Sequence, residues 1–143
     1  MKIAIGSDHG GFEYKTKIAE YIKTLGYQVE DLGTNSTKSC DYPIIAKEVA
    51  QSVSDNKFDR GILICGTGIG MSIVANKVKG VRAALCSDTF SARLTREHNN
   101  SNVLCLGQRV IGLGLALDIV DIWLKTEFSN DERHTRRISL IED

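Results

Sequence analysis

The chain has 143 residues and a mass of 15.7 kDa, which suits one compact domain and is below the size at which a single core usually divides. Hydrophobic residues make up 42% and charged residues 25%, which excludes a disordered or collagen-like chain. The 18 Lys and Arg residues balance the 18 Asp and Glu residues, so no net field draws the protein to nucleic acid or to an acidic membrane. Any recognition of a charged ligand must therefore be local.

The amino-terminal apolar run is too short for a signal peptide or a membrane span, and no other stretch approaches about 18 consecutive apolar residues. Three of the four cysteines lie in or at the end of strand-like runs, as buried thiols often do, so no disulfide framework is expected, and the histidines lack zinc-ligand spacing. The cysteines and histidines are Cys40, Cys65, Cys86, Cys105, His9, His98 and His134. We therefore expect a cytoplasmic protein that contacts no membrane and holds no metal.

Short strand-like runs alternate with helical hydrophobic periods along the whole chain. Strands are expected at residues 2–5, 27–32, 61–65, 81–86 and 102–106. The expected helices comprise one with Ile18, Ile22 and Leu25 on one face and Gly26 as its cap, one opened by Pro43, and three more over residues 71–77, 89–97 and 113–125. A capping-box pattern, Ser129-x-x-Glu132, predicts a short terminal helix in the tail, residues 126–143.

Strands that alternate with helices form a parallel sheet with right-handed crossovers. The sequence thus predicts a doubly wound, Rossmann-like three-layer α/β sandwich with a five-stranded parallel sheet, as a single domain over residues 1–143. The continuous apolar run from Gly61 to Cys65 is typical of a central strand. The tail has too few apolar residues for a core of its own, so it docks on the domain, docks on a second subunit, or stays loose.

Glycine and polar residues follow the expected strands at their carboxyl ends, the edge where such folds bind ligands. These segments are Ser7-Asp8-His9-Gly10-Gly11, Cys65-Gly66-Thr67-Gly68-Ile69-Gly70, Ser87-Asp88 and Gly107-Gln108-Arg109. The Gly66 to Gly70 loop enters a helix, so its backbone amides can converge on an anion. It matches neither a P-loop nor G-x-G-x-x-G, and the alternative is a glycine-rich turn with a packing role only.

Individual side chains in these segments each allow two interpretations. Cys65 is either a nucleophile or base at the loop, or a small core residue. His9 and His98 are either proton carriers at the ligand edge or ordinary surface residues. Arg133 and Arg137 lie four residues apart on one helix face, where they either grip a phosphate together with Arg109 or form a solvated surface.

In combination, these motifs resemble the type B ribose-5-phosphate isomerases, a family that also contains the subunits of galactose-6-phosphate isomerase. The resemblance runs from Met1 to about Ile138. The motifs that carry it, in chain order, are Ser7-Asp8-His9-Gly10-Gly11, Cys65-Gly66-Thr67-Gly68-Ile69-Gly70-Met71-Ser72, Ala75-Asn76-Lys77, Glu97-His98-Asn99-Asn100 and Arg133-His134-Thr135-Arg136-Arg137. The family implies aldose–ketose isomerisation of a sugar phosphate without metal or organic cofactor, in a homodimer whose tail reaches the partner's site. Pairing of dimers into tetramers stays open.

The resemblance also implies a role for each site residue. Cys65 matches the general base, and the loop of Gly66, Thr67, Gly68, Ile69 and Gly70 matches the hole for the enediolate. His98 matches the acid/base that opens the sugar ring, with Asp8 alongside and Asn99 as a substrate ligand. His9, Arg109, Arg133 and Arg137 match phosphate ligands, the last two acting across the interface. Thr67 matches a hydroxyl that moves protons between the substrate oxygens. A second branch of the family has a glutamate base at the position of Met71, whereas this chain resembles the cysteine branch.

The implied reaction is the interconversion of ribose 5-phosphate and ribulose 5-phosphate through a cis-enediolate. A galactose- or allose-6-phosphate isomerase of the same family remains open, because the sequence does not show the length of the pocket. A non-catalytic sugar-phosphate sensor is a third interpretation, although a sensor needs neither Cys65 nor His98. The neutral charge balance argues against nucleic-acid binding.

Overall fold

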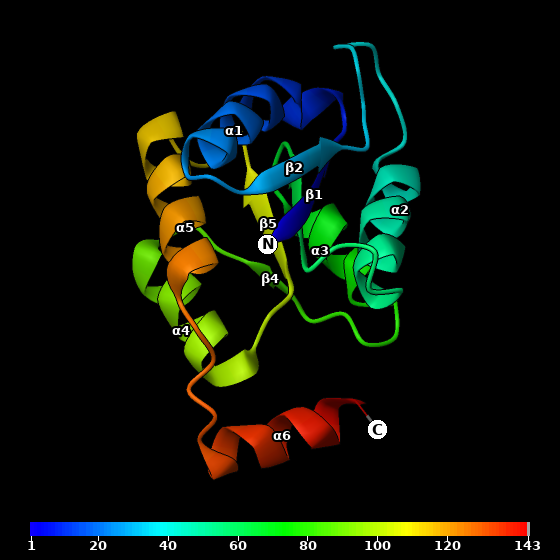
Figure 1. Cartoon of the computed structure of the whole chain (residues 1–143). Coiled ribbons are helices and arrows are strands. Elements are labelled where there is room, and N and C mark those ends of the chain that lie inside the picture. Colours follow the sequence, from blue (N-terminus) through cyan, green and yellow to red (C-terminus); the bar gives the residue numbers. More distant parts are fainter. Residues whose placement is uncertain (143) are drawn as a thin grey trace.

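The computed structural model describes residues 1–142 and contains one parallel sheet flanked by helices on both faces (Figure 1). The strands follow the order β2-β1-β3-β5-β4, and every neighbouring pair is parallel. Their bounds are β1 Lys2–Ser7, β2 Gln28–Asp31, β3 Arg60–Cys65, β4 Ala83–Leu85 and β5 Val103–Gly107. The helices are α1 Phe12–Thr24, α2 Tyr42–Ser54, α3 Ile69–Ala75, α4 Thr89–Asn99, α5 Leu113–Lys125 and α6 Glu132–Glu142. The predicted fold class is confirmed.

Two hydrophobic clusters lie on the two faces of the sheet. One joins α1, α4 and α5 to the sheet and includes the fully buried Trp123. The other joins α2 and α3 to the opposite face and contains Cys65 and Met71. Figure 1 shows these two helical layers on either side of the strands. The β3 run is buried along its whole length, as its continuous apolar sequence predicts.

The strand order reverses between β1 and β3, which are the second and third strands of the sheet. Connections leave such a pair in opposite directions and open a crevice at the carboxyl ends. Asp8 follows β1 and Gly66 follows β3, so these two segments lie together at the carboxyl ends of this strand pair. The topology therefore places two of the predicted motifs side by side.

Several predicted boundaries differ from the observed ones. α3 begins at Ile69, because Gly68 adopts a left-handed φ of 79° and ends the loop there. A single 3-10 turn at His9–Gly11 precedes α1, and β4 is only three residues long at the edge of the sheet.

The terminal helix α6 forms as predicted, although its cap is not Ser129. The Asp131 carboxylate accepts a hydrogen bond from the Arg133 amide at 2.8 Å, and this bond is the main reason that the pKa of Asp131 is lowered. The Ser129 hydroxyl instead accepts from the Asp131 amide. Aspartate is as good an N-cap as serine, and it lies closer to the first turn.

Two buried arginines fix the connection between α5 and α6. Arg60 donates to the carbonyls of Trp123 at 2.7 Å and Leu124 at 3.1 Å, at the carboxyl end of α5. Arg96 donates to Thr126 at 3.1 Å, and burial together with the nearby Arg60 lowers the pKa of Arg96 to about 10. These bonds satisfy carbonyls that a helix end leaves without partners. They anchor the chain just before it departs toward α6.

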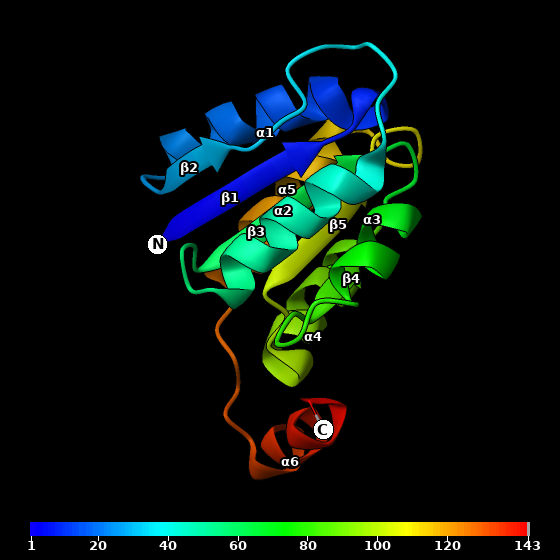
Figure 2. The same cartoon turned by 90° about the vertical axis from the view of Figure 1, so that its right-hand side faces the viewer.

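The helix α6 lies against α4, at the end of the molecule remote from the tip of the β1 arrow (Figure 2). Arg82 holds it there through an ion pair with Glu142. In the single chain, the tail helix α6 therefore docks on its own domain and is not loose. Over residues 1–142, no helix is both long and apolar enough to cross a bilayer.

Candidate active site

Cys65 is the last residue of β3 and faces the layer formed by α2 and α3. Its side chain is 6% exposed, so the thiol lies just beneath the surface of the single chain. The Gly68 amide donates a hydrogen bond to Sγ at 3.0 Å. This bond holds the sulfur against the glycine-rich loop. Cys65 is therefore buried like a core residue, and its sulfur also contacts the backbone of the glycine-rich loop.

The loop from Gly66 to Gly70 leaves several backbone N–H groups pointing away from helical partners. Within residues 1–142, the amides of Gly70 and Met71 have no hydrogen-bond acceptor, whereas the Ile69 amide donates to the Thr67 hydroxyl at 3.2 Å. Thr67 is exposed, so its hydroxyl lies on the solvent side of the loop. Unpaired amides beside a thiol can stabilise a developing oxyanion.

Close backbone packing explains the glycines of this loop. A Cβ on Gly68 would lie 2.6 Å from Leu85 Cδ1 and 2.8 Å from the Leu106 carbonyl carbon, and the φ of 79° strains any other residue. A Cβ on Gly107 would lie 2.6 Å from the Thr67 carbonyl oxygen. The loop therefore rests directly on the end of β5, and the backbone of its neighbours fixes its shape.

We expect Gly68→Ala to destabilise the protein by about 2 kcal/mol or more, because the left-handed conformation alone costs about 1–2 kcal/mol and the clash adds to it. Any chemistry that depends on the Cys65 thiol should be impaired as well, since the Gly68 amide that donates to its sulfur moves. Chemical denaturation measures the loss. Gly114→Ala is the matched control: its Cβ meets open space in α5, so its stability stays equal or rises by up to about 1 kcal/mol. Equal stabilities for the two variants would contradict this account.

The segment after β1 packs against the glycine loop. Asp8 is buried and its carboxylate accepts a hydrogen bond from the Gly10 amide at 2.9 Å. A Cβ on Gly10 would lie 3.1 Å from the Gly66 nitrogen. His9 is half-buried, and its Nδ1 accepts from the Cys40 amide at 3.3 Å. Asp8 and His9 therefore lie at the edge that holds Cys65.

Arg109 joins the same edge from the end of β5. Its amide donates to the Gly66 carbonyl at 3.0 Å, and its guanidinium Nη1 lies 3.3 Å from the position that a Cβ on Gly66 would take. The side chain is exposed, so its remaining donors are open to a ligand. A cation over a ring of free amides favours an anionic group at this edge.

His98 and Asn99 lie at the other end of the strands, where the amino ends meet. This placement corrects the expectation that His98 lies with Asp8 at the carboxyl ends of the strands in one chain. The helix α4 starts after β4 and returns to the beginning of β5, so its last residues lie near the amino ends of the parallel strands. Arg82, just before β4, donates to the Asn99 carbonyl at 2.9 Å. Asn99 is exposed there and His98 is partly exposed.

The tail arginines lie at that same end of the strands. Arg133 and Arg137 are exposed on α6, and His134 between them is buried. The His134 ring stacks on the His98 ring with centroids 4.2 Å apart and planes 20° apart. One chain thus contains two separate groups of candidate residues, one at each edge of the sheet. The Cys65 group consists of Asp8, His9, Cys65, the Gly66 to Gly70 loop and Arg109, and the His98 group consists of His98, Asn99, Arg133 and Arg137.

Tyr42 belongs with the Cys65 group, although the sequence analysis did not single it out. Its ring carbons lie 2.6 Å from the position of a Cβ on Gly70, so the ring covers the glycine loop from the start of α2. The side chain is 38% exposed. The sequence does contain a signal for Tyr42. The residue starts the helix that follows the second strand, and the start of such a helix lies near the carboxyl ends of the strands.

The other cysteines differ from Cys65 in their environment. Burial raises the pKa of Cys86 to about 11, with a further contribution from Asp88, and burial also raises the pKa of the fully enclosed Cys105. We expect iodoacetamide at pH 8 to leave both thiols unmodified in the native protein, because thiolate is the reactive form. Peptide mass spectrometry after timed labelling checks this. Labelling of Cys86 or Cys105 as fast as Cys40 would contradict the expectation.

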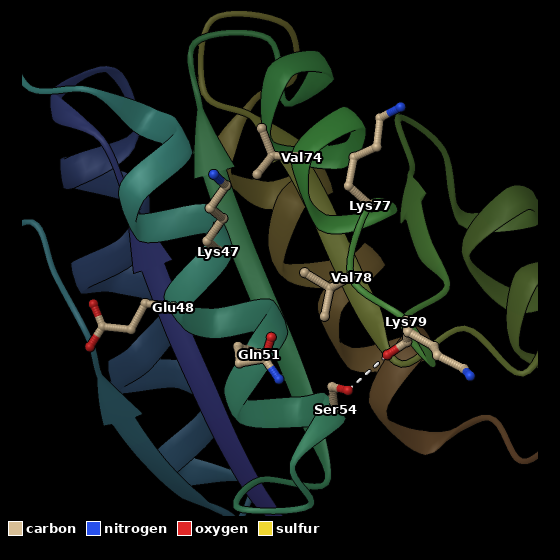
Figure 3. Close-up of a pocket in the computed structure, with 8 residues that line it drawn as sticks. All are labelled: Lys47, Glu48, Gln51, Ser54, Val74, Lys77, Val78 and Lys79. Atoms are coloured by element: carbon tan, nitrogen blue, oxygen red, sulfur yellow. Dashed lines mark hydrogen bonds between the residues drawn. The ribbon is translucent and has the colours of Figure 1, made fainter.

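Other features of the surface lie away from the candidate residues. A groove of about 550 Å³ between α2 and α3 is lined by Lys47, Lys77, Lys79 and their neighbours (Figure 3). The Ser54 hydroxyl closes one end of it by donating to the Lys79 carbonyl at 2.7 Å. Neither group of candidate residues lines this groove. Among residues 1–142, no three His, Cys, Asp or Glu side chains are arranged to hold a metal ion.

Comparison with known proteins identifies relatives along the whole chain. The family model described as Ribose/Galactose Isomerase matches residues 3–141. The ribose-5-phosphate isomerase B of Escherichia coli is 49% identical over 140 residues, covering 98% of this chain and 93% of that protein. The solved structure of Clostridium thermocellum ribose-5-phosphate isomerase B is 55% identical, with a TM-score of 0.97 over 99% of this chain and 95% of that one.

Relatives with other substrates in their names are also close. The D-erythrulose-4-phosphate isomerase of Pectobacterium atrosepticum is 47% identical over 90% of this chain and 85% of its own length. The galactose-6-phosphate isomerase subunit LacB of Clostridium acetobutylicum is 41% identical over 100% of this chain and 83% of its own length. With a family model that covers nearly every residue and relatives that agree over full length, the chain belongs to the ribose/galactose isomerase family.

Proposed function

We propose that this protein interconverts ribose 5-phosphate and ribulose 5-phosphate, with Cys65 as the general base. The observation that carries the proposal is the Cys65 sulfur within 3.0 Å of a backbone amide in a loop that has further unpaired amides. In the forward direction Cys65 removes the proton from C2 of the open-chain aldose, and negative charge moves to the aldehyde oxygen. The free amides stabilise this charge in the cis-enediolate.

The enediolate becomes the ketose when the proton returns to C1. A second proton must leave the C2 hydroxyl as its oxygen becomes the carbonyl, and the oxygen on C1 must gain one. The Thr67 hydroxyl lies on the solvent side of the loop and suits this transfer between neighbouring oxygens. Arg109 and His9 border the same edge and would hold the phosphate, whose binding energy is remote from the reacting carbons and can be used for orientation.

We further propose that a complete site needs two copies of the chain, arranged as a homodimer. In one chain the Cys65 group and the His98 group lie at opposite edges of the sheet, so neither edge alone carries both a base and a ring-opening residue. Arg133 and Arg137 are exposed, and Arg133 forms a long ion pair with Asp131, with 3.7 Å between Nη2 and Oδ2. A phosphate bound between the two guanidiniums would offset the repulsion of their like charges. In the dimer, the His98 group of one copy meets the Cys65 group of the other, and the two guanidiniums bind the phosphate.

A hexose-6-phosphate isomerase is the main alternative. The relative named as a galactose-6-phosphate isomerase subunit supports it at 41% identity, whereas proteins named as ribose-5-phosphate isomerase B reach 49% and 55%. Because charged sugar phosphates do not pass through a lipid bilayer unaided, we also propose that the protein acts in the cytoplasm.

A panel of aldose phosphates tests the proposed function. Purified protein is incubated with ribose 5-phosphate, allose 6-phosphate, galactose 6-phosphate and erythrose 4-phosphate, and the corresponding ketose is measured. We expect the highest kcat/KM for ribose 5-phosphate. A higher value for a six-carbon sugar would replace the pentose with a hexose as substrate. Ligand-dependent thermal shifts without any ketose would instead indicate a sensor.

A further inference from the structure

His134 is the one buried residue of α6, most of whose other residues are exposed. It is 7% exposed, whereas the neighbouring Arg133 and Arg137 point into solvent. Its imidazole lies face to face with that of His98, and this stack joins α6 to α4. Neither the motifs of the sequence nor the proposed reaction gives His134 a role. Its position raises the question of what a second imidazole contributes beside the first.

Burial and the nearby positive charges lower the pKa of His134 and so favour its neutral form. Burial is the main cause that lowers the pKa of His134, followed by the neighbouring His98 and Arg133. Arg137 acts in the same direction and Asp131 opposes them. A neutral ring stacked on His98 leaves that residue free to carry the proton, because two adjacent imidazolium ions would repel each other.

Among the contacts that hold α6 in place, the His98–His134 stack is the one that can orient the His98 ring. The ion pair between Arg82 and Glu142 fixes the far end of the helix, and the Ser129 amide fixes the connection through the Glu97 carbonyl at 3.2 Å. Neither contact involves the His98 ring. A partly exposed imidazole at the end of a helix otherwise rotates among its side-chain rotamers.

We propose that His134 is a positioning residue for ring opening: its stacked ring fixes the orientation of the His98 imidazole. The inference rests on the proposed function, in which His98 opens the ring of ribose 5-phosphate. In that step the proton of the C1 hydroxyl leaves to a base, the bond between C1 and the ring oxygen breaks, and the ring oxygen takes up a proton. A carrier that must reach two oxygens of one sugar needs a defined orientation.

Two assays separate ring opening from the later proton transfer. Conversion of ribose 5-phosphate requires both steps. Exchange of solvent deuterium into C1 of ribulose 5-phosphate, followed by NMR, requires only the proton transfer, because the phosphate on O5 prevents this ketose from closing a five-membered ring. A residue that orients His98 affects the first assay and spares the second.

We expect His134→Ala to lower kcat for ribose 5-phosphate by about 10-fold to 100-fold, the size of loss that a misplaced catalytic group causes. Deuterium exchange should change by less than about 2-fold. His134→Phe keeps an uncharged ring in the stack and should restore most of the lost turnover. Ser139→Ala is the matched control on the exposed surface of the same helix and should behave as wild type.

Equal losses in both assays for His134→Ala would overturn the inference, since they would mean that α6 has shifted and taken the phosphate-binding arginines with it. Unchanged turnover of ribose 5-phosphate would overturn it as well, because the stack would then be irrelevant to His98. Failure of the wild type to convert ribose 5-phosphate would reject the proposed function and the inference together. The first two outcomes are read against an active wild type, so the two failures are distinguishable.

Discussion

Replacing Cys65 with alanine should lower kcat for ribose 5-phosphate by about 10³-fold, within the range that a positioned general base contributes. The substitution removes the sulfur but retains the loop, because the glycine backbone is fixed by β5 and not by the thiol. KM should change little, since the sulfur is not among the proposed phosphate ligands. Steady-state kinetics of the purified variant measure both parameters. Deuterium exchange into ribulose 5-phosphate should fall by the same factor, because it needs the same base.

Cys86→Ala is the matched control for this prediction. Cys86 is another buried thiol, but it packs in the hydrophobic cluster on the opposite face of the sheet from Cys65. Its loss creates a small cavity and lowers stability, yet the activity of the folded protein should remain close to wild type. A Cys65→Ala variant that keeps more than about a tenth of wild-type kcat would assign the proton transfer to another group.

Removing Arg133 and Arg137 together should raise KM for ribose 5-phosphate by about 100-fold or more, since each charge-assisted contact to a phosphate is worth roughly 1.5–3 kcal/mol. Each side chain is exposed in the single chain, so the double substitution to alanine costs little stability. The effect falls mainly on KM, because the phosphate is bound equally in the ground state and in the transition state. Inorganic phosphate, as a competitive inhibitor, should lose affinity in parallel.

Arg136→Ala provides the control on the same helix. Arg136 is exposed like its neighbours and is not among the proposed phosphate ligands, so its loss removes one positive charge without removing a phosphate contact. If the tail acted only through its total positive charge, the single Arg136 variant would show about half of the change in log KM that the double variant shows. The proposed site predicts a KM near the wild-type value.

The sequence predicted the sheet well because each strand carries its own signal. The run of residues 60–65 is buried along its length, as its unbroken apolar composition requires. The start of α3 was predicted two residues late, since no pattern of side chains reveals that Gly68 turns into a left-handed conformation. The capping-box pattern points to Ser129 because it is a local signal, whereas the observed cap, Asp131, depends on where Arg60 and Arg96 anchor the connection from α5.

The position of a residue relative to the strands predicts one part of the candidate site but not the other. Cys65, Asp8 and Arg109 lie at strand ends, so parallel strands bring them together by rule. His98 lies at a helix end and precedes a strand, which places it at the other edge of the same chain. His134 was missed because ring stacking between α4 and α6 is a tertiary contact that no spacing announces.

The central claim is that one catalytic site combines the Cys65 group of one chain with the His98 group of another, and mixing two inactive variants tests it directly. Cys65→Ala and His98→Ala chains are each purified and shown to be inactive on ribose 5-phosphate. They are then refolded together in equal amounts, and native mass spectrometry verifies that mixed dimers form. Each mixed dimer holds one site with both defects and one site with neither.

We expect the mixture to recover roughly a quarter of the wild-type specific activity, because about half of the dimers are mixed and half of their sites are intact. Variants of Cys65 and Arg109, which the account places in the same half of the site, should show no recovery when they are mixed. A Cys65 and His98 mixture that forms mixed dimers and stays as inactive as its parents would contradict the account.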